Sequence, residues 1–326
     1  MRLCILIALA LPVAAQTYLI TDLGASSSAY AINASGQITG TSQKGARSPA
    51  FLYSGGKLTT LGTLGGEYSQ GQGINSSASI AGYSTLSDGS YRAFLYANGK
   101  MTNLGTLGAN YSAAYGINDA GSVAGSSNNS ANLPRAFLYS GGQMIDLGTL
   151  GGNQPGWSTS AYAINNSDQV AGYSYIPTGE FHAFLYSNGA MQDLGTLGGS
   201  YSQAYAINNS GQITGEAYLP GNAKAHAFLY SAGKMTDLGA LHVYSSGFSI
   251  NSSGAIAGQA DVKNNTGFLI YHAVIYANGK PEDLNKLIPS GSGWVLSAAT
   301  SINDAGEIAG YGTLHGAQHA FLLTPK

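Results

Sequence analysis

The sequence predicts an all-β protein, specifically a seven-bladed β-propeller with four-stranded blades. Three observations support this prediction: the composition, a segment that recurs seven times, and two incomplete repeats at the ends that complement each other. The 326 residues include 47 Gly and 22 Tyr, and only 9% of them are charged. Because Gly, Ser, Asn and Thr form helices poorly, and because disordered chains are rich in charge and poor in aromatic residues, this composition favours strands separated by turns.

The recurring segment is marked by the dipeptide Ile-Asn. In each copy Ile or Val stands five residues after the Asn, and Gly stands seven residues after it. The mean spacing of about 45 residues is typical of a propeller blade, in which each repeat supplies four antiparallel strands. The repeat asparagines are Asn33, Asn75, Asn118, Asn165, Asn208, Asn251 and Asn303.

The four strands of one repeat follow one another in a fixed order. After the first strand, Asn-Asn-Ser-Gly (208–211) predicts a type I turn closed by a left-handed Gly. Asn-Gly pairs, as at 98–99, predict two-residue hairpin turns between the third and fourth strands. Short turn-bounded runs rich in aromatic and β-branched residues are strands rather than helices. In the fifth repeat they are Tyr-Ala-Ile-Asn (205–208), Gln-Ile-Thr-Gly (212–215), His-Ala-Phe-Leu-Tyr (226–230) and Met-Thr-Asp-Leu (235–238).

The two ends of the repeat array complement each other. Residues 18–24 match a fourth strand that no earlier strand precedes, and the last repeat stops after its third strand at 319–323. We therefore expect residues near Tyr18 to Leu23 to pair with residues near Ala320 to Leu323, so that the N-terminal strand completes the last blade. Ring closure also removes an exposed sheet edge. A β-solenoid or an open meander is the alternative.

The repeated text resembles the bacterial extracellular HAF-repeat family. Three motifs carry the resemblance over nearly all of the chain after residue 15: His-Ala-Phe-Leu-Tyr, Asp-Leu-Gly-Thr-Leu-Gly-Gly and Ile-Asn-x-x-Gly-x-Ile-x-Gly. Pro49, Arg92 and Arg135 depart from the motif His, and Asn285 replaces the Gly of Asp-Leu-Gly. The resemblance implies secretion and a repeat fold, and it implies no reaction.

The first fifteen residues have the pattern of a secretory signal peptide. Arg2 precedes a short apolar run, and Val13-Ala14-Ala15 offers small residues for cleavage. We expect residues 1–15 to be removed and residues 16–326 to form one propeller domain, secreted to the extracellular space, with a periplasmic destination as the alternative. No later apolar stretch is long enough to insert into a membrane. The formal net charge of −2 without a basic run argues against nucleic acid as a partner.

Residues that recur in every repeat are interpreted as structural. The Ile before the Asn, the Ile or Val of the second strand and the Leu of Asp-Leu-Gly are expected to pack between blades, and the Asn to cap the first turn. The His of the third strand is interpreted as a hydrogen-bonding residue at a strand start, and the Asp of the fourth strand as a residue that makes a local hydrogen bond to a neighbouring strand. We therefore predict no metal and no cofactor. The four histidines are His182, His226, His272 and His319.

Catalytic motifs are absent from the sequence. It contains no Gly-x-Ser-x-Gly elbow, no phosphate loop and no His-Glu-x-x-His motif. We therefore predict a protein that is not an enzyme. Two neighbouring carboxylates facing the channel would instead favour a propeller hydrolase or lyase. The carboxylates that break the repeat are Glu67, Asp88, Glu180, Glu216, Asp261, Glu282 and Glu307.

The candidate binding residues are aromatics in the connections between the fourth strand of one repeat and the first strand of the next. If the first strand is innermost, these side chains lie near the channel mouth, on the face that also carries the variable loops. They are Tyr68, Tyr111, Trp157, Tyr201, Tyr244 and Trp294. Aromatic rings with Ser and Asn around them suit a neutral polar ligand such as a glycan, or an extracellular protein surface. The alternative is a structural or adhesive scaffold in which the same rings pack between blades.

Overall fold

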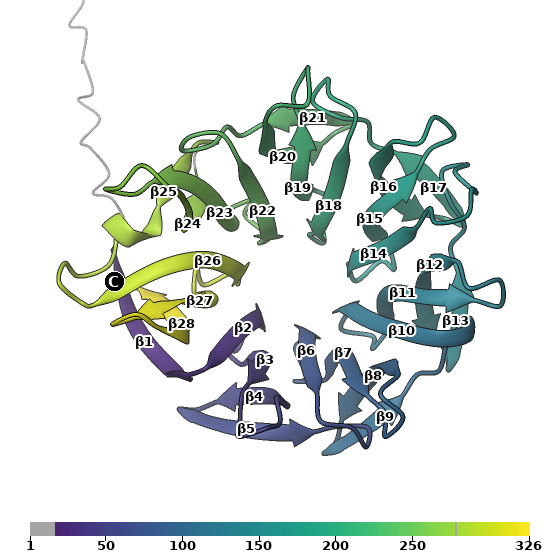
Figure 1. Ribbon diagram of the computed structural model, residues 1–326, viewed down its shortest axis with the longest axis horizontal. Coiled ribbons are helices and arrows are strands. Elements are labelled where there is room, and N and C mark those ends of the chain that lie inside the picture. The colour runs from purple at the N-terminus through teal and green to yellow at the C-terminus, as the bar shows by residue number, and fades with distance from the viewer. Residues whose placement is uncertain (1–16, 278) are drawn as a thin grey trace, which may run out of the picture.

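The computed structural model describes residues 17–277 and 279–326, and the signal peptide predicted for residues 1–15 lies outside them. Seven four-stranded antiparallel sheets stand around a central axis like the blades of a propeller (Figure 1). The predicted fold class and blade number are therefore confirmed. Among the described residues the helical content is one 3-10 turn, η1 (Leu284–Lys286), and no described helix is long and apolar enough to cross a membrane.

The strands run in chain order from the inside to the outside of each of the first six blades. Blade 1 contains β2 (Ser27–Ile32), β3 (Ile38–Ser42), β4 (Ala50–Ser54) and β5 (Lys57–Gly62); blade 2 contains β6 (Ser69–Ile74), β7 (Ile80–Thr85), β8 (Tyr91–Ala97) and β9 (Lys100–Asn103); blade 3 contains β10 (Gly108–Ile117), β11 (Val123–Asn129), β12 (Pro134–Ser140) and β13 (Gln143–Asp146); blade 4 contains β14 (Thr159–Ile164), β15 (Val170–Tyr175), β16 (Phe181–Ser187) and β17 (Ala190–Asp193). Blade 5 contains β18 (Ser202–Ile207), β19 (Ile213–Tyr218), β20 (Ala225–Ser231) and β21 (Lys234–Asp237); blade 6 contains β22 (Ser245–Ile250), β23 (Ile256–Lys263), β24 (Leu269–Tyr276) and β25 (Pro281–Asp283); blade 7 contains β26 (Trp294–Ile302), β27 (Ile308–Leu314), β28 (Ala317–Pro325) and β1 (Tyr18–Ala25).

Blade 7 closes the ring as the sequence predicts. Its outermost strand is the N-terminal β1, which pairs antiparallel with the C-terminal β28. The register places Tyr18 opposite Pro325 and Asp22 opposite Phe321. Tyr18 is almost fully buried in this blade, so burial of a large aromatic side chain adds to the hydrogen bonds that hold the two ends together.

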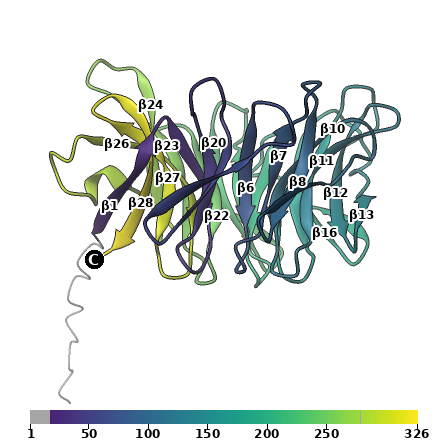
Figure 2. The ribbon, with the colours of Figure 1, turned by 90° about the horizontal axis from the view of Figure 1, so that it is seen from below.

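The two faces of the disc differ in the length of their connections. The turns after the first and third strands are tight and lie on the face where the chain ends (Figure 2). The connections after the second and fourth strands lie on the opposite face and vary in length, from one residue (Ser26) to twelve (147–158). We call these the turn face and the loop face. Variable sequence is therefore concentrated on the loop face, around the mouth of the channel.

The hydrophobic core consists of seven separate clusters rather than one centre. The cluster between blades 3 and 4, for example, joins Leu147 with Ile164, Val170 and Phe184. Leu147, Ile164 and Val170 are repeat positions that were predicted to pack between blades, and the third-strand Phe184 joins them. A fully buried side chain of this size contributes about 1.5–3 kcal/mol, so each blade is stable mainly through its neighbours.

Blade 6 departs from the repeat where its sequence departs. The Gly of Asp-Leu-Gly has a positive φ in other blades, as at Gly239 with φ 72°. Asn285 replaces this Gly in blade 6, and the chain there forms η1 directly after the short strand β25. The side chain of Asp283 caps the turn by accepting the backbone N–H of Asn285 at 2.9 Å.

Candidate functional site: the central channel and the loop face

The innermost strand of every blade carries a β-bulge at the same position. In blade 5, Ala204 pairs with Gly215 and Ala206 with Thr214, which leaves Tyr205 without a partner on the next strand. A bulge redirects the side chain of its extra residue. The unpaired residues stand three positions before the repeat Asn and are Tyr30, Gln72, Tyr115, Tyr162, Tyr205, Phe248 and Thr300.

The bulge explains the recurring Gly of the second strand. A Cβ atom added to Gly215 would lie 1.8 Å from the carbonyl oxygen of Gln203 on the bulged strand. The equivalent Gly of each other blade has a backbone carbonyl within 2.1 Å of such an atom. No L side chain fits at that approach, so the repeat requires Gly opposite each bulge.

The unpaired side chains line a cavity in the channel. Together with Tyr311 they enclose about 290 Å³, which we call the channel cavity. Four aromatic rings on consecutive blades form one side of it, and we call Tyr115, Tyr162, Tyr205 and Phe248 the channel arc. Neighbouring ring centroids along the arc are 5.3, 5.6 and 5.7 Å apart, and the rings are tilted against one another.

The phenols of the channel arc stay neutral at physiological pH. The pKa of Tyr115, of Tyr162 and of Tyr205 is raised above the ordinary value of a phenol. Burial is the largest cause, and the charges of neighbouring groups are the second. A neutral phenol can both donate and accept one hydrogen bond. The channel cavity therefore offers ring surface together with polar groups that bind uncharged hydroxyls and amides.

One carboxylate stands beside the channel arc. The residue directly after the second-strand Gly is Thr41, Tyr83, Ser126, Tyr173, Glu216, Gln259 or Tyr311, so only blade 5 has an acid there. Oε2 of Glu216 accepts a hydrogen bond of 2.6 Å from Oγ of Ser246 in blade 6. The sequence analysis identified Glu216 as a break in the repeat and did not assign it to the channel.

The predicted aromatic residues are half-buried at the loop face, and four of them belong to one network. Trp157 stacks on Tyr175 with ring centroids 5.4 Å apart. Tyr201 packs against Phe181 of the preceding blade with ring centroids 4.7 Å apart. The network continues through further ring contacts into the channel arc. Its members are Tyr68, Tyr83, Tyr91, Tyr111, Tyr115, Trp157, Tyr162, Tyr173, Tyr175, Phe181, Tyr201, Tyr205, Tyr218 and Phe248.

The other two predicted aromatics have different surroundings. The hydroxyl of Tyr244 donates to the carbonyl oxygen of Ala223 at 3.2 Å. Trp294 packs edge-on against His319 and Phe321 within blade 7. None of the six predicted residues lines the channel cavity itself, whose lining comes from the bulged positions that sequence reasoning did not single out.

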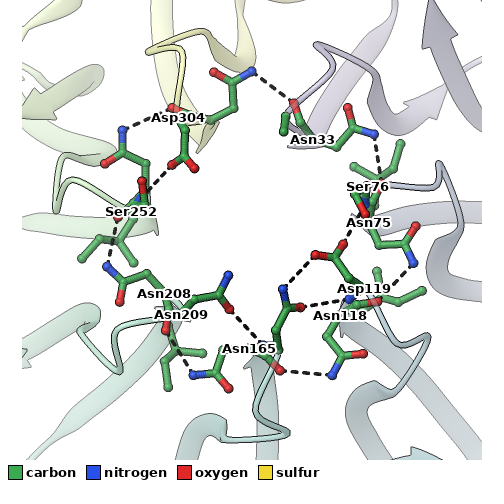
Figure 3. Close-up of a pocket in the computed structure, with 18 of the residues that line it drawn as sticks. Asn33, Asn75, Ser76, Asn118, Asp119, Asn165, Asn208, Asn209, Ser252 and Asp304 are labelled. Atoms are coloured by element: carbon green, nitrogen blue, oxygen red, sulfur yellow. Dashed lines mark hydrogen bonds between the residues drawn. The ribbon is translucent and has the colours of Figure 1, made fainter.

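On the turn face the seven repeat asparagines form a closed ring of hydrogen bonds (Figure 3). Each Nδ2 donates to the backbone carbonyl oxygen of the equivalent Asn in the next blade at 2.9–3.2 Å, and Asn303 completes the ring by donating to Asn33. Each Oδ1 also accepts backbone N–H groups of its own turn, as from Ser210 and Gln212 at 3.0 Å for Asn208. The predicted turn cap is confirmed, and the bond between blades is additional.

The recurring His and Asp both make local hydrogen bonds, as expected, and the structure shows that they make them to each other. Nδ1 of His182 lies 2.8 Å from a carboxylate oxygen of Asp193 on the adjacent strand, and His226 makes the same contact with Asp237 at 2.9 Å. The pair recurs in blades 6 and 7, and each pair belongs to its own blade. Within residues 17–277 and 279–326 no three His, Cys, Asp or Glu side chains form a group able to hold a metal ion.

Comparison with known proteins identifies the fold and nothing finer. No protein-family model matches the chain, and no curated protein sequence matches it. Similar solved structures include TolB from Acinetobacter baumannii, with 13% identity and a TM-score of 0.50 over 94% of this chain and 65% of that chain. The extracellular domain of a hybrid two component system from B. thetaiotaomicron has 13% identity and a TM-score of 0.55 over 94% of this chain and 39% of that one. A puromycin-hydrolyzing peptidase from Mycobacterium tuberculosis has 13% identity and a TM-score of 0.53 over 91% of this chain and 48% of that chain.

The chain therefore spans between 39% and 65% of the length of these three proteins. They are described by different roles and share only the propeller architecture with this chain at such low identity. The channel and the loop face, rather than the fold, have to carry any argument about function.

Proposed function

We propose that this protein is a secreted, non-catalytic binding propeller of the HAF-repeat kind, and that it recognises a neutral polar ligand, a glycan, on its loop face. The observation that carries the proposal is the aromatic network, which runs without interruption from loop-face residues such as Tyr68 and Trp157 into the channel arc. A scaffold without a pocket has no need for rings that line an open cavity.

The chemistry of the surface suits a saccharide. Ring faces offer apolar contact to the C–H faces of a sugar, while phenol, amide and hydroxyl groups hydrogen-bond its hydroxyls. Gln72 and Thr300 stand on the other side of the channel cavity and supply such polar groups. An extracellular protein surface is the second candidate, because the same network extends outward over the loop face.

Two of the carboxylates that break the repeat have surroundings that support a role without catalysis. Asp261 is buried and accepts the backbone N–H groups of Val243 and Tyr244 at 2.8 Å each. Glu307 accepts the side-chain N–H of Asn303 at 2.7 Å on the turn face. Both acids are therefore engaged in holding turns and loops, which is a structural use.

A glycan array with purified residues 16–326 tests this proposal. We expect the parent to bind a restricted set of uncharged glycans, Tyr162→Ala to lose that binding, and Tyr162→Phe to retain part of it because the ring remains. Ile145→Ala, on an exposed outermost strand, is the matched control and should bind like the parent. An array without any bound glycan, or equal binding by Tyr162→Ala, would overturn the proposal.

A further inference from the structure

The half-buried carboxylate of Glu216 has no cationic partner. Oγ of Ser246 donates a hydrogen bond to it, the phenol of Tyr205 lies within hydrogen-bonding reach of it, and no Lys, Arg or His forms an ion pair with it among the described residues. The seven innermost strands contain no Lys, Arg or His in their sequences. A carboxylate that is partly withdrawn from water without a counter-charge is unfavourable, and a bound cation relieves this cost.

Aromatic rings surround this carboxylate. Burial raises the pKa of Tyr205 and of Tyr218, and the negative charge of Glu216 is the next largest cause. The carboxylate of Glu216 therefore lies among the rings of blade 5. Tyr162 of blade 4 and Tyr271 of blade 6 respond to the same charge. Tyr311, which occupies the position of Glu216 in blade 7, lines the channel cavity, and Ser246, which donates to Glu216, lies on the innermost strand β22. Glu216 therefore stands beside the residues that line the channel cavity, on the side of the channel arc.

Ring faces and a carboxylate together favour an organic cation. The face of a Tyr or Phe ring attracts an ammonium group, most strongly when the group is desolvated, and aromatic cages bind methylated ammonium ions in this way. The channel cavity, at about 290 Å³, exceeds the roughly 30 Å³ of a water molecule several times, so it admits an ammonium group with alkyl substituents. A small inorganic cation would gain little from rings and would retain its water.

We propose that the channel cavity is a binding subsite for an organic ammonium group, in which Tyr162 and Tyr205 contact the alkyl substituents and Glu216 supplies the balancing charge. This site goes beyond the proposed recognition of a neutral glycan, because it selects a charged group and does not require that the ligand be a saccharide. A free ammonium compound and an ammonium group carried by a larger ligand present the same chemistry to it.

Isothermal titration with tetramethylammonium chloride tests the subsite, with tert-butanol as the neutral probe of similar shape. We expect one tetramethylammonium ion to bind per protein, and tert-butanol to bind at least about tenfold more weakly because it lacks the charge. Potassium chloride at the same concentration should leave the binding of tetramethylammonium largely unchanged.

Variants assign the site to named groups. Glu216→Gln should weaken the binding of tetramethylammonium about tenfold or more, while Asp88→Asn, which changes an exposed loop carboxylate with no contact to the channel cavity, should leave it unchanged. Circular dichroism melting establishes that both variants are folded. Absence of binding to the folded parent, equal binding by folded Glu216→Gln, or displacement by potassium would each overturn the proposal. Binding of the probe by a protein that binds no array glycan would overturn the glycan proposal alone.

Discussion

The ring of asparagines on the turn face should contribute strongly to stability, and Asn208 allows this to be measured. Asn208 is buried, and its side chain makes three hydrogen bonds with backbone groups. Two are accepted from the N–H groups of Ser210 and Gln212 at 3.0 Å, and one is donated to the carbonyl oxygen of Asn251 at 3.0 Å. The first two hold the turn of blade 5, and the third joins blade 5 to blade 6.

The expected loss follows from these three bonds. A hydrogen bond contributes about 0.5–1.5 kcal/mol net, and a buried group left without its partner costs about 1–3 kcal/mol. Asn208→Ala removes these three bonds at once, together with the bond that Nδ2 donates to Oε1 of Gln212 at 2.8 Å, so we expect the free energy of unfolding to fall by about 3–5 kcal/mol. Urea titration followed by circular dichroism measures this loss as a lower midpoint with an unchanged slope.

Two further variants separate the contribution of the Asn208 oxygen from that of its N–H groups and provide a control. Asn208→Asp keeps the oxygen that accepts the turn N–H groups and loses the two bonds donated by Nδ2, to the carbonyl oxygen of Asn251 in blade 6 and to Oε1 of Gln212, so a smaller loss of about 1–3 kcal/mol is expected. Asn265→Ala, in the exposed loop between β23 and β24, is the matched control and should stay within about 0.5 kcal/mol of the parent. An Asn208→Ala protein as stable as this control would refute the reasoning.

Four further predictions concern closure, the bulge, the loop face and the channel phenols. Deletion of residues 16–24 removes β1 from β28 and should lower stability by several kcal/mol and promote association through the exposed edge, detectable by light scattering; an unchanged melting temperature would contradict ring closure. Gly215→Ala should prevent folding or destabilise by more than about 3 kcal/mol, because its Cβ would meet the carbonyl of Gln203, and a parent-like urea midpoint would contradict the bulge. Trp157→Ala should cost about 0.5–1.5 kcal/mol for its stacked pair with Tyr175, whereas a loss of 3 kcal/mol or more would indicate core packing. Burial raises the folded-state pKa of the channel phenols above the unfolded value of about 10. Their contribution to the free energy of unfolding is therefore fully present below about pH 10 and should be lost as the pH rises above it. A urea midpoint that stays constant to about pH 11 would contradict this.

The fold was predictable because the sequence pattern of one blade recurs seven times in the chain. The repeat of Ile-Asn identified the blades, and the unmatched segments near Tyr18 and Leu323 identified the closing pair. These signals are local patterns whose meaning does not depend on details of packing. That the His and Asp make local hydrogen bonds was also predictable, but their pairing with each other became evident only from the register of the third and fourth strands.

The lining of the channel cavity was not predictable in the same way. Tyr205 and Ile207 are two residues apart, and in a regular strand such residues point to the same side. The alternation of a regular strand would place Tyr205 on the same side as the buried Ile207, whereas the bulge turns Tyr205 into the channel. The signal available was the invariant distance of ten residues between the position three before each repeat Asn and the second-strand Gly. The need for Gly becomes evident only when the two strands are paired.

The bond between blades at each Asn depends on ring geometry in a similar way. The turn cap follows from the sequence Asn-x-x-Gly alone, because both groups lie within one turn. The acceptor of Nδ2 belongs to a repeat 42 to 52 residues further along the chain, or in one case at the other end of it. Only the closed propeller brings these groups together.

The most direct test of ligand recognition by the channel and loop face is a crystal structure of the protein grown with the glycan that it binds most tightly on the array. The account predicts a sugar ring at the loop-face end of the channel, in contact with at least one ring of the channel arc and hydrogen-bonded to a neighbouring polar group. A sugar bound on the turn face or against the outermost strands, with the channel cavity holding only solvent, would contradict it.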